Sequence, residues 1–237
     1  MGMRSCRGKT GTFACPLRMR RSIVVKDSMS IDYNQIAGRS VERIAALSDG
    51  LFAIAMTIIV LELHTPAAEI IRSESDLLHG LIEVSPKILM FLMSFLTLGI
   101  FWVGQQTQLN HLARADRNLA WLHLAFLFFV SMVAFTTKLL GEFMGFRLAL
   151  VIYWLNILML GVALWLGWRY AVAAGLLKED TPPQLLAAVE RRIVVYQALY
   201  AACMLFAFYS VPLSIGLIVL MQLNSAVAPK IWPLSKI

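Results

Sequence analysis

The sequence is poor in charged residues and in cysteine, and each shortage excludes a class of protein. Only 15% of its 237 residues are charged, whereas soluble domains average about 25%. Three cysteines (Cys6, Cys15 and Cys203) are too few for a disulfide scaffold. Apolar residues make up 59% of the chain and the mean hydropathy is +0.72, which excludes a disordered chain. This apolar mass exceeds what a soluble core needs, so we expect a lipid bilayer to bury the rest.

The sequence also lacks the common catalytic motifs. It contains no Gly-x-Ser-x-Gly, no His-Glu-x-x-His and no pair of membrane aspartates. The four histidines, His64, His79, His111 and His123, are dispersed, so we interpret each as a surface or interface residue rather than a metal ligand. We predict that the protein is not an enzyme and holds no cofactor or metal.

Long apolar segments predict the fold. Crossing about 30 Å of hydrocarbon takes roughly 20 apolar residues as a helix. Six segments qualify or come close: 44–63, 88–104, 119–140, 148–168, 193–209 and 212–227. Pro212 divides the last two, because proline ends or kinks a helix; one kinked helix over 193–227 is the alternative. The fold class predicted is therefore an all-α membrane protein with six transmembrane helices.

The basic residues predict the orientation. With a cytoplasmic N-terminus, all of the 21 Lys and Arg residues fall on the inner side except Arg72, Lys87, Lys138 and Arg147. This bias follows the positive-inside rule and places both termini in the cytoplasm. It also accounts for the net charge of +7 without a nucleic-acid partner, since the cations are scattered over connections rather than gathered on one face.

Three regions are expected along the chain. Residues 1–38 form a basic cytoplasmic tail that we expect to be disordered, and Met29 is an alternative start. Residues 39–228 form one six-helix domain without an internal repeat, and residues 229–237 form a cytoplasmic C-terminal tail.

The first apolar segment carries polar residues that are costly in a membrane and are usually functional. On a helical wheel of about 100° per residue, one narrow stripe contains Arg43, Leu47, Gly50, Ile54, Ile58 and Leu61. Thr57 lies at its edge. Ser48 and Asp49 point more than a quadrant away, so we expect them to face neighbouring helices, where Asp49 needs a partner. The stripe alone fits lipid contact or packing as well as a pore.

Residues 43–63, RIAALSDGLFAIAMTIIVLEL, resemble the Arg-x-x-x-Phe-Ser-Asp signature of the transmembrane protein 175 family of potassium channels. The resemblance extends more loosely over residues 39–225, through Ser94-Phe95, Trp102, Asp116, Trp121 and Phe135-Thr136. The sequence departs from the family at Leu47, where Phe is usual, at Gln105, where His is expected, and at His123, where Asn is common.

The resemblance implies a potassium channel in which four identical chains surround an axis with their first helices. Carried over, Ile54 forms the narrowest ring, Ile58 and Leu61 form further apolar rings, and Thr57 contributes to selectivity. Arg43, Ser48, Asp49 and Gly50 belong to the signature, and the first three are expected to join the cytoplasmic ends of the helices. The partners implied are potassium ions, the bilayer and three further copies of the chain. The short prokaryotic members of the family imply a multi-pass protein of the bacterial inner membrane.

Two other functions stay open on the residues alone. A secondary transporter would use a polar site near the midplane, but Asn156 and Gln197 are isolated and are interpreted as interhelical hydrogen bonds. A membrane scaffold without transport activity is the third interpretation. The chain lacks a TVGYG-like filter run, so a channel would have to select through its apolar ring.

Overall fold

The computed structural model describes residues 40–69 and 71–227, which contain six α-helices and no strand. The helices are α2 (Val41–Leu61), α3 (Glu74–Asn110), α4 (Arg117–Glu142), α5 (Arg147–Ala173), α6 (Pro183–Leu205) and α7 (Val211–Val227), with a 3-10 turn η1 (Phe206–Phe208) before α7. The predicted tails, 1–38 and 229–237, and the alternative start at Met29 lie outside the described residues. The domain boundaries 39 and 228 stay predictions.

Five of these helices, α2 to α6, are long and apolar enough to cross a membrane, and α7 is a shorter apolar helix. The all-helical prediction is confirmed. Side-chain caps begin three of the helices, because the oxygens of Ser40, Ser73 and Asp116 accept from the amides of Arg43, Asp76 and Leu119. The sequence thus marks several helix starts by local chemistry.

The segment 193–227 contains two helices, so the prediction of a turn is confirmed and the single kinked helix is wrong. Helix α6 ends at Leu205, η1 follows, and α7 begins at Val211. Pro212 therefore lies in the first turn of α7, where its missing amide donor costs no intrahelical hydrogen bond.

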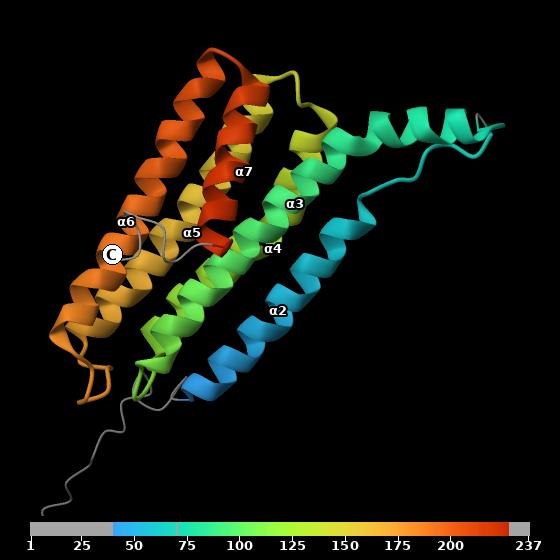
Figure 1. Cartoon of the computed structure of the whole chain (residues 1–237). Coiled ribbons are helices and arrows are strands. Elements are labelled where there is room, and N and C mark those ends of the chain that lie inside the picture. Colours follow the sequence, from blue (N-terminus) through green and yellow to red (C-terminus); the bar gives the residue numbers. More distant parts are fainter. Residues whose placement is uncertain (1–39, 70, 228–237) are drawn as a thin grey trace, which may run out of the picture. The chain divides into compact units, whose positions relative to one another are not determined.

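Two helices begin well before the apolar segments predicted to span the membrane. Helix α3 starts at Glu74, ahead of the segment 88–104, and α6 starts at Pro183, ahead of the segment 193–209. Both extensions are too polar to lie in the hydrocarbon of a bilayer. Each is nevertheless helical, because the backbone hydrogen bonds of a helix form in water as well as in lipid. Pro86 lies within α3, and Figure 1 shows the N-terminal part of α3 turning away from the rest of that helix.

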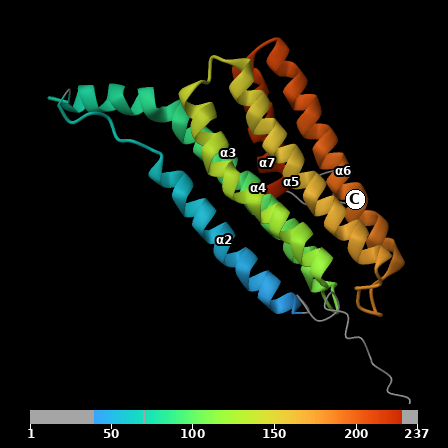
Figure 2. The ribbon, with the colours of Figure 1, turned by 180° about the vertical axis from the view of Figure 1, so that it is seen from behind.

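The helices alternate in direction, and neighbours in sequence pack together (Figures 1 and 2). Helix α2 packs against α3 and α4, and α6 packs against α5 and α7. The connections after α3 and after α5 meet at one end, where the amide of Ala113 donates to Leu176 O at 2.9 Å. Basic residues of both connections therefore share that end of the bundle.

A layer of buried polar side chains joins five helices inside the apolar core. Tyr153 Oη on α5 lies 3.2 Å from Ser94 Oγ and 3.1 Å from Thr97 Oγ1, both on α3. Thr137 of α4 donates to Ser94 at 2.6 Å, and Gln222 of α7 donates to Thr97 at 2.7 Å and to Tyr200 of α6 at 3.2 Å. Hydrogen bonds of this kind fix which faces of apolar helices meet.

Replacing Tyr153 with Phe should lower the stability of the bundle. The ring is buried and its hydroxyl meets two partners, and such interhelical bonds average about 0.6 kcal/mol in membranes. We expect a lower temperature of aggregation in a detergent thermal-shift assay. Tyr209→Phe is the matched control, since Tyr209 is 86% exposed. Equal shifts for both variants would contradict a structural role for this layer.

Candidate functional site

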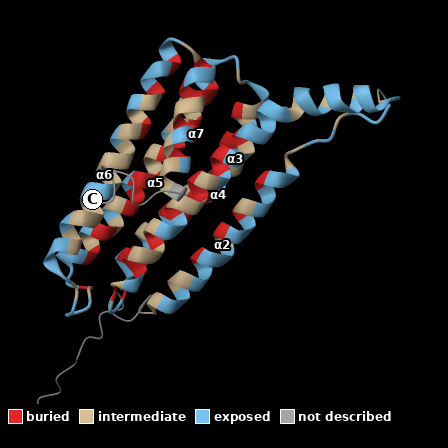
Figure 3. Ribbon diagram, in the orientation of Figure 1, coloured by how far each residue is buried: buried red, intermediate tan, exposed pale blue. Residues whose placement is uncertain are grey.

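Helix α2 has two faces with different chemistry. One face is buried against α3 and α4 through Ser48, Phe52, Ala55 and Ile59. The other face is apolar and uncovered in the single chain (Figure 3): Leu47 is 50% exposed, Ile54 58%, Ile58 42% and Leu61 75%. These four residues are called the α2 stripe below. The helical wheel predicted this division correctly, although exposure alone does not assign the stripe a role.

Ser48 anchors the buried face. Its hydroxyl is fully buried and donates to Ile44 O at 2.8 Å, one turn back on α2. The amide of Gln105 on α3 donates to Ser48 Oγ at 2.7 Å, and His123 Nε2 on α4 lies 3.0 Å from the same oxygen. Gln105 and His123 also contact each other. Two of the three positions that depart from the family pattern, Gln105 and His123, are thus partners of each other and of the signature serine.

Asp49 points to α3 as expected, but to residues that the sequence did not single out together. Its Oδ1 accepts from Trp102 Nε1 at 2.8 Å and from Gln106 Nε2 at 2.5 Å. Ser48 and Asp49 therefore tie adjacent positions of α2 to α3 and α4. Two neighbouring attachments fix the rotation of α2, which sets the direction of the α2 stripe.

The other two signature residues behave differently. The guanidinium of Arg43 is exposed and has no partner within residues 40–69 and 71–227, while its backbone amide takes part in the Ser40 cap. A contact of Arg43 with another helix stays a prediction. Gly50 is exposed, and a Cβ built on it would meet nothing within 4 Å. Close packing within one chain therefore does not require a glycine at position 50.

Thr57 lies at the edge of the stripe and is exposed. Its hydroxyl is close to Ile54 O at 2.9 Å and Ala53 O at 3.0 Å, so its proton is used within α2. The hydroxyl oxygen keeps its acceptor capacity, and an oxygen of this kind attracts a cation.

The far end of α2 is held by an ion pair that sequence reasoning missed. Glu62 Oε2 lies 2.8 Å from Lys138 Nζ on α4. The sequence could have predicted this ion pair, because Glu62 and Lys138 lie near the same end of the first and third apolar segments. With this pair, α2 is attached to its neighbours at both ends.

The isolated polar residues of the later helices form interhelical bonds, as predicted. Asn156 Nδ2 donates to Phe129 O at 3.3 Å, and Gln197 Nε2 donates to Ile157 O at 3.2 Å. Within the described residues, no group of three or more His, Cys, Asp or Glu side chains is arranged to hold a metal. These bonds offer no polar midplane site of the kind a transporter uses.

Comparison with known proteins gives consistent matches. The family described as the endosomal/lysosomal potassium channel TMEM175 matches residues 43–133. A potassium channel of Streptomyces collinus is 30% identical over 182 residues, covering 73% of this chain and 85% of the relative. A potassium channel of Chamaesiphon minutus is 31% identical over 178 residues, covering 73% and 87%.

A solved structure is similar in fold. The crystal structure of a lysosomal potassium-selective channel TMEM175 homologue from Chamaesiphon minutus has a TM-score of 0.69 and 27% identity, and covers 81% of this chain and 98% of that chain. These relatives and the five long apolar helices make the chain a multi-pass membrane protein. An enzyme function is excluded in the same way, because the matching proteins are ion channels.

Proposed function

The chain belongs to the TMEM175 family of ion channels, and on that premise we propose that it conducts potassium through a pore lined by α2. The observation that carries the proposal is the α2 stripe, which is apolar and uncovered while the opposite face of the same helix is buried and hydrogen-bonded. The bonds of Ser48 and Asp49 hold α2 at one rotation, which a pore helix needs so that the same residues face the axis in every copy.

Four copies of the chain would complete the pore. A helix exposing Ile54 and Ile58 cannot enclose an ion by itself, so the stripe must meet the same stripe of other copies around a symmetry axis. Four α2 helices would then present Ile54 as the narrowest ring, with Ile58 and Leu61 as further rings. The relatives named potassium channels support potassium as the permeant ion.

Selectivity would arise from the cost of stripping water. Water is held poorly in a narrow apolar ring, which allows gating by dewetting. Potassium holds its hydration shell less tightly than sodium and therefore loses part of it at a lower cost. Thr57, which is exposed and lies about one turn from Ile54, would return part of the lost coordination through its hydroxyl oxygen.

Ion flux into liposomes tests this function. Purified protein should pass potassium down its gradient without a coupled ion and without saturation at low concentrations. Light scattering coupled to size exclusion in detergent should give the mass of four 26.5 kDa chains. Saturable, ion-coupled flux would instead indicate a transporter, and no flux would indicate a scaffold; either result would refute the proposal.

A further inference from the structure

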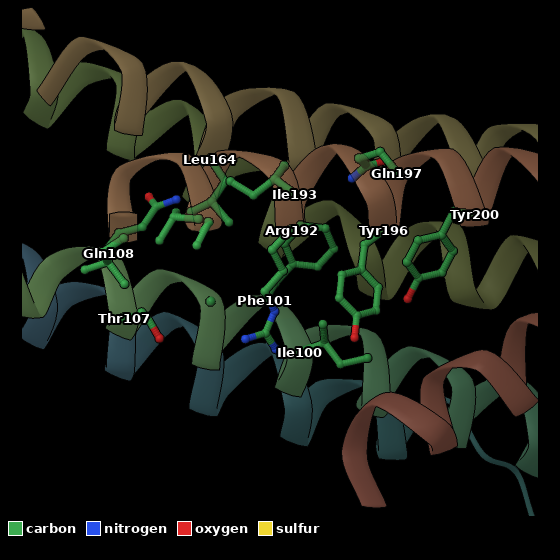
Figure 4. Close-up of a pocket in the computed structure, with 14 residues that line it drawn as sticks. Ile100, Phe101, Thr107, Gln108, Leu164, Arg192, Ile193, Tyr196, Gln197 and Tyr200 are labelled. Carbon is green, nitrogen blue, oxygen red and sulfur yellow. The ribbon is translucent and has the colours of Figure 1, made fainter. Parts of the chain in front are cut away.

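A cavity lies between α3, α5 and α6, away from the α2 stripe. Its volume is about 150 Å³. Gly104 on α3 creates part of the space, because a Cβ there would still lie 3.8 Å from Leu164 Cδ2. Ala188 on α6 lines the opposite side with another small residue. Figure 4 shows the side chains of all three helices gathered around this space.

One charged side chain lines the cavity. Arg192 is exposed, and its one interaction within the described residues is with the ring of Tyr196, 5.7 Å from the guanidinium carbon. It directly precedes the apolar segment predicted from 193 onward, so we expect it at the level of the lipid headgroups on the side predicted to be cytoplasmic. An arginine at this level without a carboxylate partner attracts the anionic groups of lipids.

A second side chain independently indicates a ligand. Gln108 of α3 is 7% exposed, and its Nε2 is buried without a hydrogen-bond partner among the described residues. It lines the same cavity as Arg192. A buried amide donor left unpaired is unfavourable, and a ligand oxygen would satisfy it. Gln197 Oε1 is also unpartnered but is an acceptor, so it would bind a hydroxyl or water rather than an anion.

The remainder of the cavity is apolar. Ile100, Phe101, Leu164 and Ile193 line it between the helices. A cavity of about 150 Å³ with such walls is large enough to hold a ring of the size of benzene, and thus a short length of hydrocarbon chain. The site joins a cation and an amide donor to an apolar space, which matches an amphiphile with an anionic head.

We propose that this cavity binds an acidic glycerophospholipid, with its phosphate at Arg192, an ester carbonyl oxygen at Gln108 Nε2 and part of an acyl chain between α3, α5 and α6. The bilayer supplies such lipids at the depth where Arg192 lies. The proposal does not depend on ion conduction, because the cavity is built from helices other than α2.

Native mass spectrometry of the purified full-length chain in detergent, titrated with phosphatidylglycerol or phosphatidylcholine, tests the proposal. Phosphatidylglycerol should be retained at concentrations about tenfold lower than phosphatidylcholine. Arg192→Gln should remove this preference. Arg191→Gln is the matched control, since it removes one charge from the adjacent, exposed position that does not line the cavity.

A second variant tests the apolar part of the site. Gly104→Ile should fill the cavity while leaving Arg192 in place, and should weaken lipid retention several-fold without lowering the melting temperature measured before lipid is added. If the Arg191 and Arg192 variants lose the preference for phosphatidylglycerol to the same extent, the preference arises from surface charge alone and the proposal is overturned. Unchanged retention in Gly104→Ile, equal retention of the two lipids, or full competition by inorganic phosphate would overturn it as well.

Discussion

Replacing Ile54 with Asn should raise the unitary conductance and bring potassium and sodium permeability close together. The change exchanges an apolar ring for a hydrated one of similar size, so ions need to lose less water at the constriction. Each 1.4 kcal/mol removed from the barrier raises the rate about tenfold. Single-channel recording in planar bilayers, with reversal potentials under bi-ionic conditions, measures both effects.

The fold should tolerate this substitution. Ile54 is 58% exposed in the single chain and is not part of the packing between α2 and its neighbours. Val60→Asn is the matched control, because Val60 is 45% exposed on the same helix but lies off the α2 stripe; its reversal potential should not change. If Ile54→Asn also leaves the reversal potential unchanged, Ile54 does not form the constriction.

Replacing Asp49 with Ala should reduce assembly rather than selectivity. The change removes the acceptor of Trp102 Nε1 and Gln106 Nε2, and each lost hydrogen bond costs about 1 kcal/mol. Helix α2 would then rotate more freely, so its stripe would meet the other copies in several orientations. We expect a smaller tetramer fraction in size exclusion with light scattering. The loss should be large because the substitution is present in every subunit.

Asp49→Asn separates hydrogen bonding from charge. The amide keeps one acceptor oxygen for Trp102 or Gln106, so this variant should assemble better than Asp49→Ala. A tetramer of normal abundance whose selectivity has changed would show that Asp49 acts on the permeating ion. Such a result would reverse the roles proposed here for Asp49 and Ile54.

The chemistry of the candidate site was only partly visible in the sequence. The helical wheel placed Ser48 and Ile54 on different faces correctly, because both residues lie on one helix and helix geometry fixes the angle between their side chains. It could not find Gln105 and His123 as partners of Ser48, or Gln106 as a partner of Asp49, because those contacts join helices. The cavity beside Arg192 was equally invisible, since three helices enclose it.

The sequence by itself determined the class, the number of apolar helices and most of their positions, because the hydrophobic cost of crossing a bilayer is set segment by segment. Hydropathy did not predict the polar N-terminal parts of α3 and α6, because a helix can extend beyond its apolar segment wherever its backbone hydrogen bonds form. The tertiary structure decided which face of each helix is covered. Apolar faces resemble one another, so the rotation of α2 depends on contacts with distant residues, including the Glu62–Lys138 pair.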